Sequence, residues 1–120
     1  IGVEGLNALN HLESLKILKC AKCYLTDVKL FSSFHNLQTL YAGENKLGPE
    51  AITSLASLSK LTELRLNLTN IGSTGAALLS QMVGLQNLDI SDAGVSDKEA
   101  MKKVIDLPDL RFLNFDYNLK

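Results

Sequence analysis

A short segment recurs five times along this chain, and no other feature constrains its fold as strongly. The five copies read LKILKCAKCYL, LQTLYAGENKL, LTELRLNLTNI, LQNLDISDAGV and LRFLNFDYNLK. They begin at Leu15, Leu37, Leu61, Leu85 and Leu110, so the offsets of 22, 24, 24 and 25 residues give a period near 24. Over seven equivalent positions of the five units, 34 of 35 residues are apolar, whereas a 46% hydrophobic composition would give about 16.

The apolar spacing changes within each unit. Counted from the first leucine, positions zero, three and five are apolar, and the alternation at their end predicts a short strand. Before that leucine, apolar residues recur every three positions, which predicts a helical or 3-10 turn with one face inward. Pro49 marks the start of one such turn, Ser96 with Glu99 forms a capping-box pattern before another, and the 22-residue unit leaves room only for a short or irregular turn over Thr26 to Phe34.

The pattern L-x-x-L-x-L-x-x-N-x-L at this period resembles the leucine-rich repeat family over essentially all 120 residues. The resemblance implies an α/β fold: a right-handed, horseshoe-shaped solenoid with a concave parallel sheet and helical or 3-10 turns on the convex side. The runs AGENKLGPEAITSL and NLTNIGSTGAALL are similar to family repeats with true convex helices. A weaker similarity links Leu107 to Asn114 with the C-terminal cap of small nuclear leucine-rich proteins, in which an Asp replaces Asn114.

In this family the ninth residue of the pattern, counting the first leucine as residue one, is an Asn that turns inward and bonds the backbone of the neighbouring coil. Here that position holds Cys23, Asn45, Thr69, Ala93 and Asn118. Cys and Thr keep some bonding capacity, whereas Ala keeps none. We therefore expect the fourth turn, at Ala93, to be the least well tied unless Asp92 or water substitutes.

Composition excludes several classes of protein. With 12 basic and 13 acidic side chains the net charge is −1, which is unlike a basic nucleic-acid binder or an acidic disordered tail. No apolar run approaches the length of a membrane span, so we expect no membrane partner. We expect one domain over 1–120, either a processed or trimmed protein or a segment of a longer solenoid. Reduced thiols favour a cytoplasmic or nuclear location.

No catalytic constellation or cofactor motif emerges, and the sequence predicts no enzyme. Cys20 and Cys23 form a C-x-x-C, but the repeat contradicts a thioredoxin-like context, and His11 and His35 are not at zinc-ligand spacing. We therefore predict free thiols that point into the solenoid, and no metal site. Asn67-Leu68-Thr69 is a formal glycosylation sequon, but Thr69 falls at an inward position.

The predicted partner-binding face consists of outward strand positions and the turns that follow them. The charge of these sets runs +2, −1, 0, −2 and −1 from the first unit to the fifth, and Tyr41, Phe112 and Tyr117 are aromatic residues of the kind found in hot spots. The candidate residues are Lys19, Lys22, Tyr41, Glu44, Glu63, Arg65, Asn87, Asp89, Asp92, Phe112, Asn114, Asp116 and Tyr117.

The predicted function is a non-enzymatic interaction module that binds a protein or peptide on its concave face. The alternative is an adaptor or regulatory subunit that recruits substrate to an enzyme, such as a ubiquitin ligase, a phosphatase or a GTPase regulator. Five strands give a face of about 350 Å², against about 800 Å² per partner in a standard interface, so this face alone suits a weak or peptide-sized contact. If flanking repeats are missing, uncapped apolar ends predict self-association.

Overall fold

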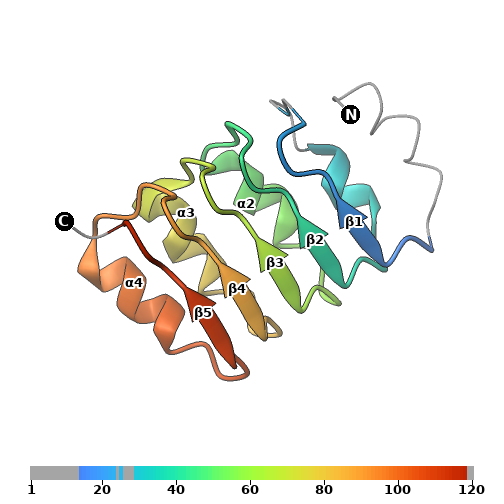
Figure 1. The fold of residues 1–120 in the computed structure, drawn as a ribbon. Coiled ribbons are helices and arrows are strands. Elements are labelled where there is room, and N and C mark those ends of the chain that lie inside the picture. Colours follow the sequence, from blue (N-terminus) through green and yellow to red (C-terminus); the bar gives the residue numbers. More distant parts are fainter. Residues whose placement is uncertain (1–13, 24, 26–28, 119–120) are drawn as a thin grey trace.

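Five short parallel strands form one sheet in the computed structural model, which describes residues 14–23, 25 and 29–118 (Figure 1). They are β1 (Ile17–Lys19), β2 (Thr39–Tyr41), β3 (Glu63–Arg65), β4 (Asn87–Asp89) and β5 (Phe112–Asn114), in sequence order. The register places the third-position leucines side by side: Leu18, Leu40, Leu64, Leu88 and Leu113. The predicted strand of every unit is thus confirmed.

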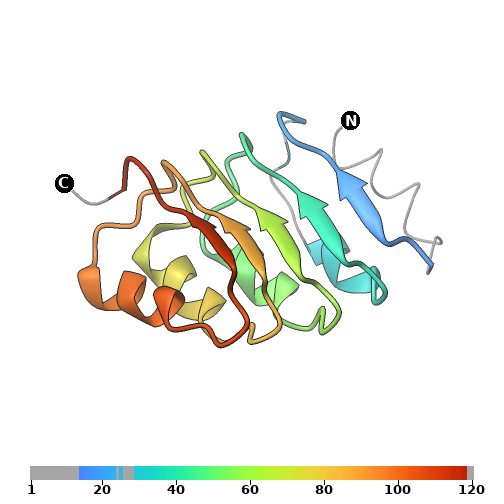
Figure 2. The same cartoon turned by 60° about the horizontal axis from the view of Figure 1, so that its bottom comes forward.

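Helical turns cover one face of this sheet and leave the other open (Figure 2). They are the 3-10 helix η1 (Lys29–Ser33) and the α-helices α2 (Glu50–Leu55), α3 (Gly72–Leu79) and α4 (Lys98–Ile105). The two convex helices expected from the second and third units are present. The short turn expected in the first is confirmed over 29–34, while Thr26 to Val28 lie outside the described residues.

The starts of the helices agree with the sequence in one case and correct it in another. Pro49 is the N-cap of α2, immediately before its first residue, as its position predicted. At α4 the capping-box prediction was wrong, because the N-cap is Asp97, whose carboxylate accepts a hydrogen bond from Glu99 N at 3.0 Å. The backbone N–H groups of residues 96 and 97 donate instead to the Ser73 hydroxyl of the preceding coil, at 3.1 and 3.0 Å.

The core is a column of aliphatic side chains between sheet and helices. Among the described residues, every apolar repeat position from Leu18 to Leu107 is buried. The exceptions lie in the first and last described coils, where Leu15, Leu110 and Leu113 are half-buried and Phe115 is 39% exposed. A repeat buries its apolar face against its neighbours, and the described repeat positions between Leu18 and Leu107 show this burial in full.

The ninth position behaves differently from coil to coil. Asn45 joins the first two coils, and Asn118 joins the last two. The Thr69 hydroxyl donates only to Leu66 O of its own coil. Ala93 supplies no side-chain hydrogen bond, and the Asp92 side chain makes none with the described part of the chain. Ala93 thus supplies no side-chain tie of its own, but the expectation that the fourth turn is the least well tied is wrong, because the Asn118 side chain accepts hydrogen bonds from Ala93 N at 2.8 Å and from Val95 N at 3.1 Å.

Candidate functional site

The register of the sheet sorts the predicted face into two rows. One row crosses the strands as Ile17, Thr39, Glu63, Asn87 and Phe112; the other crosses them as Lys19, Tyr41, Arg65, Asp89 and Asn114. Both rows flank the buried leucines of the strands and point to the side that carries no helices. Nine of these ten side chains are polar or aromatic, and only Ile17 is aliphatic.

Tyr41 is the centre of a cluster over β1 to β3. The guanidinium carbon of Arg65 lies 4.0 Å from the centroid of the Tyr41 ring, and the ammonium nitrogen of Lys19 lies 5.2 Å from it. The Tyr41 hydroxyl donates a hydrogen bond to Glu63, whose carboxylate is also 4.0 Å from Arg65. This bond raises the pKa of the Tyr41 hydroxyl above its ordinary value of 10.0, because ionisation would remove the proton that the hydroxyl donates to Glu63. The Tyr41 cluster (Lys19, Tyr41, Glu63 and Arg65) is therefore largely satisfied within the chain.

The other half of the face is open. A shallow hollow of about 540 Å³ crosses β3, β4 and β5. The buried leucines of β3 and β4 line it, together with Phe112, which is 59% exposed. The residues that line it are Glu63, Leu64, Arg65, Asn87, Leu88, Asp89, Phe112 and Asn114. We refer to this feature as the β3–β5 hollow.

Asp89 is held in place at this hollow but is not neutralised. One carboxylate oxygen accepts hydrogen bonds from Ser91 N at 2.9 Å and from the Ser91 hydroxyl at 2.7 Å. Arg65 is its register partner on β3, yet the guanidinium turns to Tyr41 instead. Among the described residues Asp89 forms no ion pair, because the Arg65–Glu63 contact is the one salt bridge found there.

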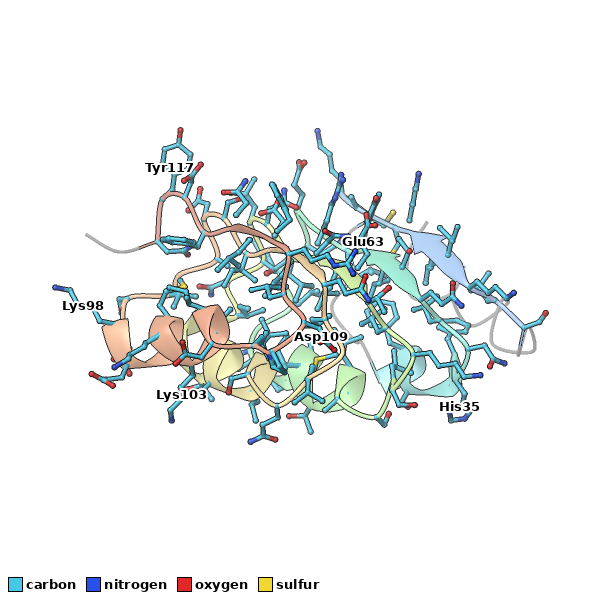
Figure 3. The ribbon with its side chains drawn as sticks, turned by 90° about the horizontal axis from the view of Figure 1, so that it is seen from below. His35, Glu63, Lys98, Lys103, Asp109 and Tyr117 are labelled. Atoms are coloured by element: carbon cyan, nitrogen blue, oxygen red, sulfur yellow. The ribbon has the colours of Figure 1, made fainter. Side chains whose placement is uncertain are left out.

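The turns that leave the strands carry the remaining predicted residues. Lys22, Glu44, Asp92 and Tyr117 each adopt a positive φ, between 47° and 65°, at equivalent repeat positions. Tyr117 is 82% exposed, and Figure 3 shows it pointing away from the side on which Lys103 of α4 lies. Asp116 is exposed beside it. These side chains form a rim along one edge of the open face.

Sequence reasoning passed over Leu68 as a site residue, although it occupies the same rim position. Leu68 has φ 57° and is 50% exposed. A left-handed backbone is unfavourable by about 1–2 kcal/mol for a residue with a Cβ. The signal was available in the sequence, because the repeat aligns Leu68 with Lys22, Glu44, Asp92 and Tyr117.

The residues weighed for chemistry lie elsewhere. Cys20 is buried and Cys23 is half-buried, and both are free thiols. Burial, together with the nearby Cys23, raises the pKa of the Cys20 thiol from 9.0 to about 12. His35 is exposed, whereas His11 lies outside the described residues. Across the described ranges no group of three His, Cys, Asp or Glu side chains could hold a metal ion.

The sequon at Asn67 is built into the coil. Thr69 is fully buried and donates to Leu66 O at 2.5 Å. The Asn67 side chain lies so close to Gly43 that a Cβ there would be 2.2 Å from Asn67 Oδ1. The sequon is therefore part of the packing between the second and third coils, as its repeat position predicted.

No helix in the described part of the chain is long and apolar enough to cross a membrane. No protein-family model matches the sequence, and no curated protein matches it. Solved structures do match. Internalin C2 (inlC2) of Listeria monocytogenes is similar over 92% of this chain, with a TM-score of 0.75 and 25% sequence identity. Another internalin of that organism (inlF) is similar over 88% of it, with a TM-score of 0.62 and 24% identity.

The chain spans 46% of the length of internalin C2 and 42% of that of the second internalin. The likeness therefore concerns the repeat region rather than the activity of either whole protein. It agrees with the five-fold repeat of the sequence and with the parallel sheet of leucines in register. On these grounds the chain is a leucine-rich repeat protein with an α/β solenoid fold, an architecture that typically serves as a scaffold for protein interaction.

Proposed function

We propose that this chain is a non-enzymatic interaction module that binds a protein or peptide on its concave face, at the β3–β5 hollow. The observation that carries the proposal is the exposed Phe112 beside a hollow lined by Asn87, Asp89 and Asn114. An exposed aromatic ring surrounded by polar groups is the usual composition of a binding hot spot and its rim.

The Tyr41 cluster and the β3–β5 hollow differ in how available their side chains are to a partner. In the Tyr41 cluster the aromatic ring, both cations and Glu63 already contact one another, so a partner would have to break these contacts. The hollow presents Phe112 and Asp89 without such competition. The rim residues Leu68 and Tyr117 would enlarge the contact beyond the flat sheet, which by itself suits a peptide-sized ligand.

Peptides selected from a random display library on the wild-type protein provide the test. Phe112→Ala should weaken their binding at least tenfold, about 1.4 kcal/mol, because it removes the apolar anchor. The matched control is Ile105→Ala, which removes an exposed apolar side chain (51% exposed) from α4 on the convex side. If Ile105→Ala weakens binding as much as Phe112→Ala, the peptides do not bind specifically on the concave face and the proposal fails.

A further inference from the structure

The open face brings an aromatic ring and a carboxylate together twice. In the Tyr41 cluster, Glu63 and the Tyr41 ring are both contacted by one guanidinium, that of Arg65. At the β3–β5 hollow, Asp89 and Phe112 lie on neighbouring strands, two residues apart in register. Both line the same hollow, and no cation of the described chain pairs with Asp89.

The charges around the hollow favour a positive ligand. Glu63 and Asp89 line it, and Asp92 follows on the adjoining rim. Arg65 is the one cation among the lining residues, and its guanidinium is committed to Tyr41 and Glu63. An incoming cation would therefore meet the uncompensated carboxylate of Asp89, whose charge also steers association, whereas Glu63 is already paired with Arg65.

We infer that the β3–β5 hollow binds an arginine side chain of an extended, positively charged peptide segment. The inference rests on the proposed function and names its partner chemistry. A guanidinium can form an ion pair with the Asp89 carboxylate, to which it donates hydrogen bonds, while its plane stacks on the exposed Phe112 ring. The side-chain oxygen of Asn87, on the strand between Glu63 and Phe112, offers a further acceptor. Lysine carries the same charge but lacks the planar fork and stacks less well.

Three short peptides test the chemistry directly. They are acetylated, amidated Gly-Gly-X-Gly-Gly, with X arginine, lysine or citrulline, and citrulline keeps the planar shape without the charge. Binding is followed by NMR, through the side-chain amide signals of Asn87 and Asn114 and the ring signals of Phe112. The arginine peptide should bind about threefold or more tightly than the lysine peptide, and the citrulline peptide should produce no saturating shifts.

Two conservative variants locate the contacts. Asp89→Asn should weaken the arginine peptide about threefold or more, because an Asn can keep the Ser91 hydrogen bonds while the charge is lost. Phe112→Leu should weaken it about twofold through loss of stacking. Asp109→Asn, an exposed carboxylate outside the hollow, should leave its affinity unchanged. Equal binding of arginine and citrulline peptides, or an equal effect of Asp89→Asn and Asp109→Asn, overturns the inference.

The display-selected peptides separate this inference from the proposed function. If they depend on Phe112 but bind the Asp89→Asn variant unchanged, the arginine inference is wrong and the binding function stands. If these peptides bind the Phe112→Ala variant as tightly as the wild-type protein, the proposed function itself is wrong.

Discussion

Neighbouring coils meet at two kinds of joint, by which we mean the contact between one coil and the next. At one kind, as at Asn45, the ninth residue of the pattern links the coils through its side chain; at the other, as at Ala93, it does not. Asn45 accepts hydrogen bonds from the backbone N–H groups of Cys23 and Leu25, both at 3.0 Å, and donates to three carbonyl oxygens. Ala93 has no polar side chain, and its own link to the preceding coil is the hydrogen bond that Gly72 N donates to its carbonyl at 3.0 Å, while the Ser73 hydroxyl links the same two coils further along the chain. Both joints nevertheless keep the same sheet register.

The comparison indicates that aliphatic packing can keep a coil in register where the ninth residue of the pattern makes no side-chain hydrogen bond to the neighbouring coil. The two Asn ties lie at the outer joints of the described solenoid, next to the first and last described coils, where Leu15, Leu110 and Leu113 are half-buried. The inner joints, at Thr69 and Ala93, lie where α2, α3 and α4 pack against one another. Because η1 also packs against α2 across the first joint, the following variants test how much stability the Asn ties add to the packing of the coils.

Asn45→Ala should have the largest effect, a loss of about 3 kcal/mol in the free energy of unfolding. It removes five hydrogen bonds and leaves the buried backbone groups of Cys23, Leu25 and Cys20 without this partner. Urea unfolding measures the change. The control is Gln81→Ala, which shortens an exposed amide and should stay within about 0.5 kcal/mol.

The Cys20 thiol reports on the same joint. Since its pKa is raised to about 12, little thiolate is present at pH 8, and alkylation of the folded protein should be slow. A raised pKa stabilises the folded state below the ordinary value of 9.0, and this stability is lost as the pH rises through about 12. Asn45→Ala should expose Cys20 and speed its alkylation; an unchanged rate would mean that Asn45 does not hold this coil.

Asn118→Ala should cost about 2 kcal/mol. The side chain accepts from Ala93 N at 2.8 Å and from Val95 N at 3.1 Å, and it donates to Ile90 O at 2.7 Å. The loss is smaller than at Asn45 because the last described coil is more open to water, which can replace part of the bonding. Hydrogen exchange at the Ala93 and Val95 amides should accelerate, whereas exchange at Leu64, in the middle of the sheet, should not.

Thr69→Val should cost about 1 kcal/mol. It keeps the shape of the fully buried side chain and removes only the hydroxyl that donates to Leu66 O. Thermal unfolding measures the effect, with Thr53→Val on the exposed face of α2 as a matched control. A loss as large as that of Asn45→Ala would show that the inner joints depend on side-chain ties after all.

Ala93→Asn should add about 0.5–1 kcal/mol of stability. By repeat equivalence its amide would reach the backbone N–H groups of Thr69 and Ile71, as Asn118 reaches those of Ala93 and Val95. The gain is smaller than the losses above because the site is now closely packed around a methyl group. A destabilised variant would mean that the inner joint has no room for the amide.

The open face shows the limit of sequence reasoning. The repeat predicted which residues point outward, and the register places Lys19, Tyr41, Arg65, Asp89 and Asn114 in one row as that alignment implied. On sequence alone, Tyr41 and Phe112 are equivalent candidates for the aromatic residue that contacts a partner. In the structure Tyr41 is held by its own chain, while Phe112 is exposed.

The sequence by itself determined the solenoid, its strands and its core, because a five-fold apolar repeat can be buried only by stacking equal coils. The tertiary structure decided how side chains from different coils share partners. Arg65 could turn to Tyr41 and Glu63 or to Asp89, and the spacing of residues along the chain does not distinguish these choices. Only the packed sheet does, because cross-strand neighbours and the rotamers they allow exist once the coils are stacked.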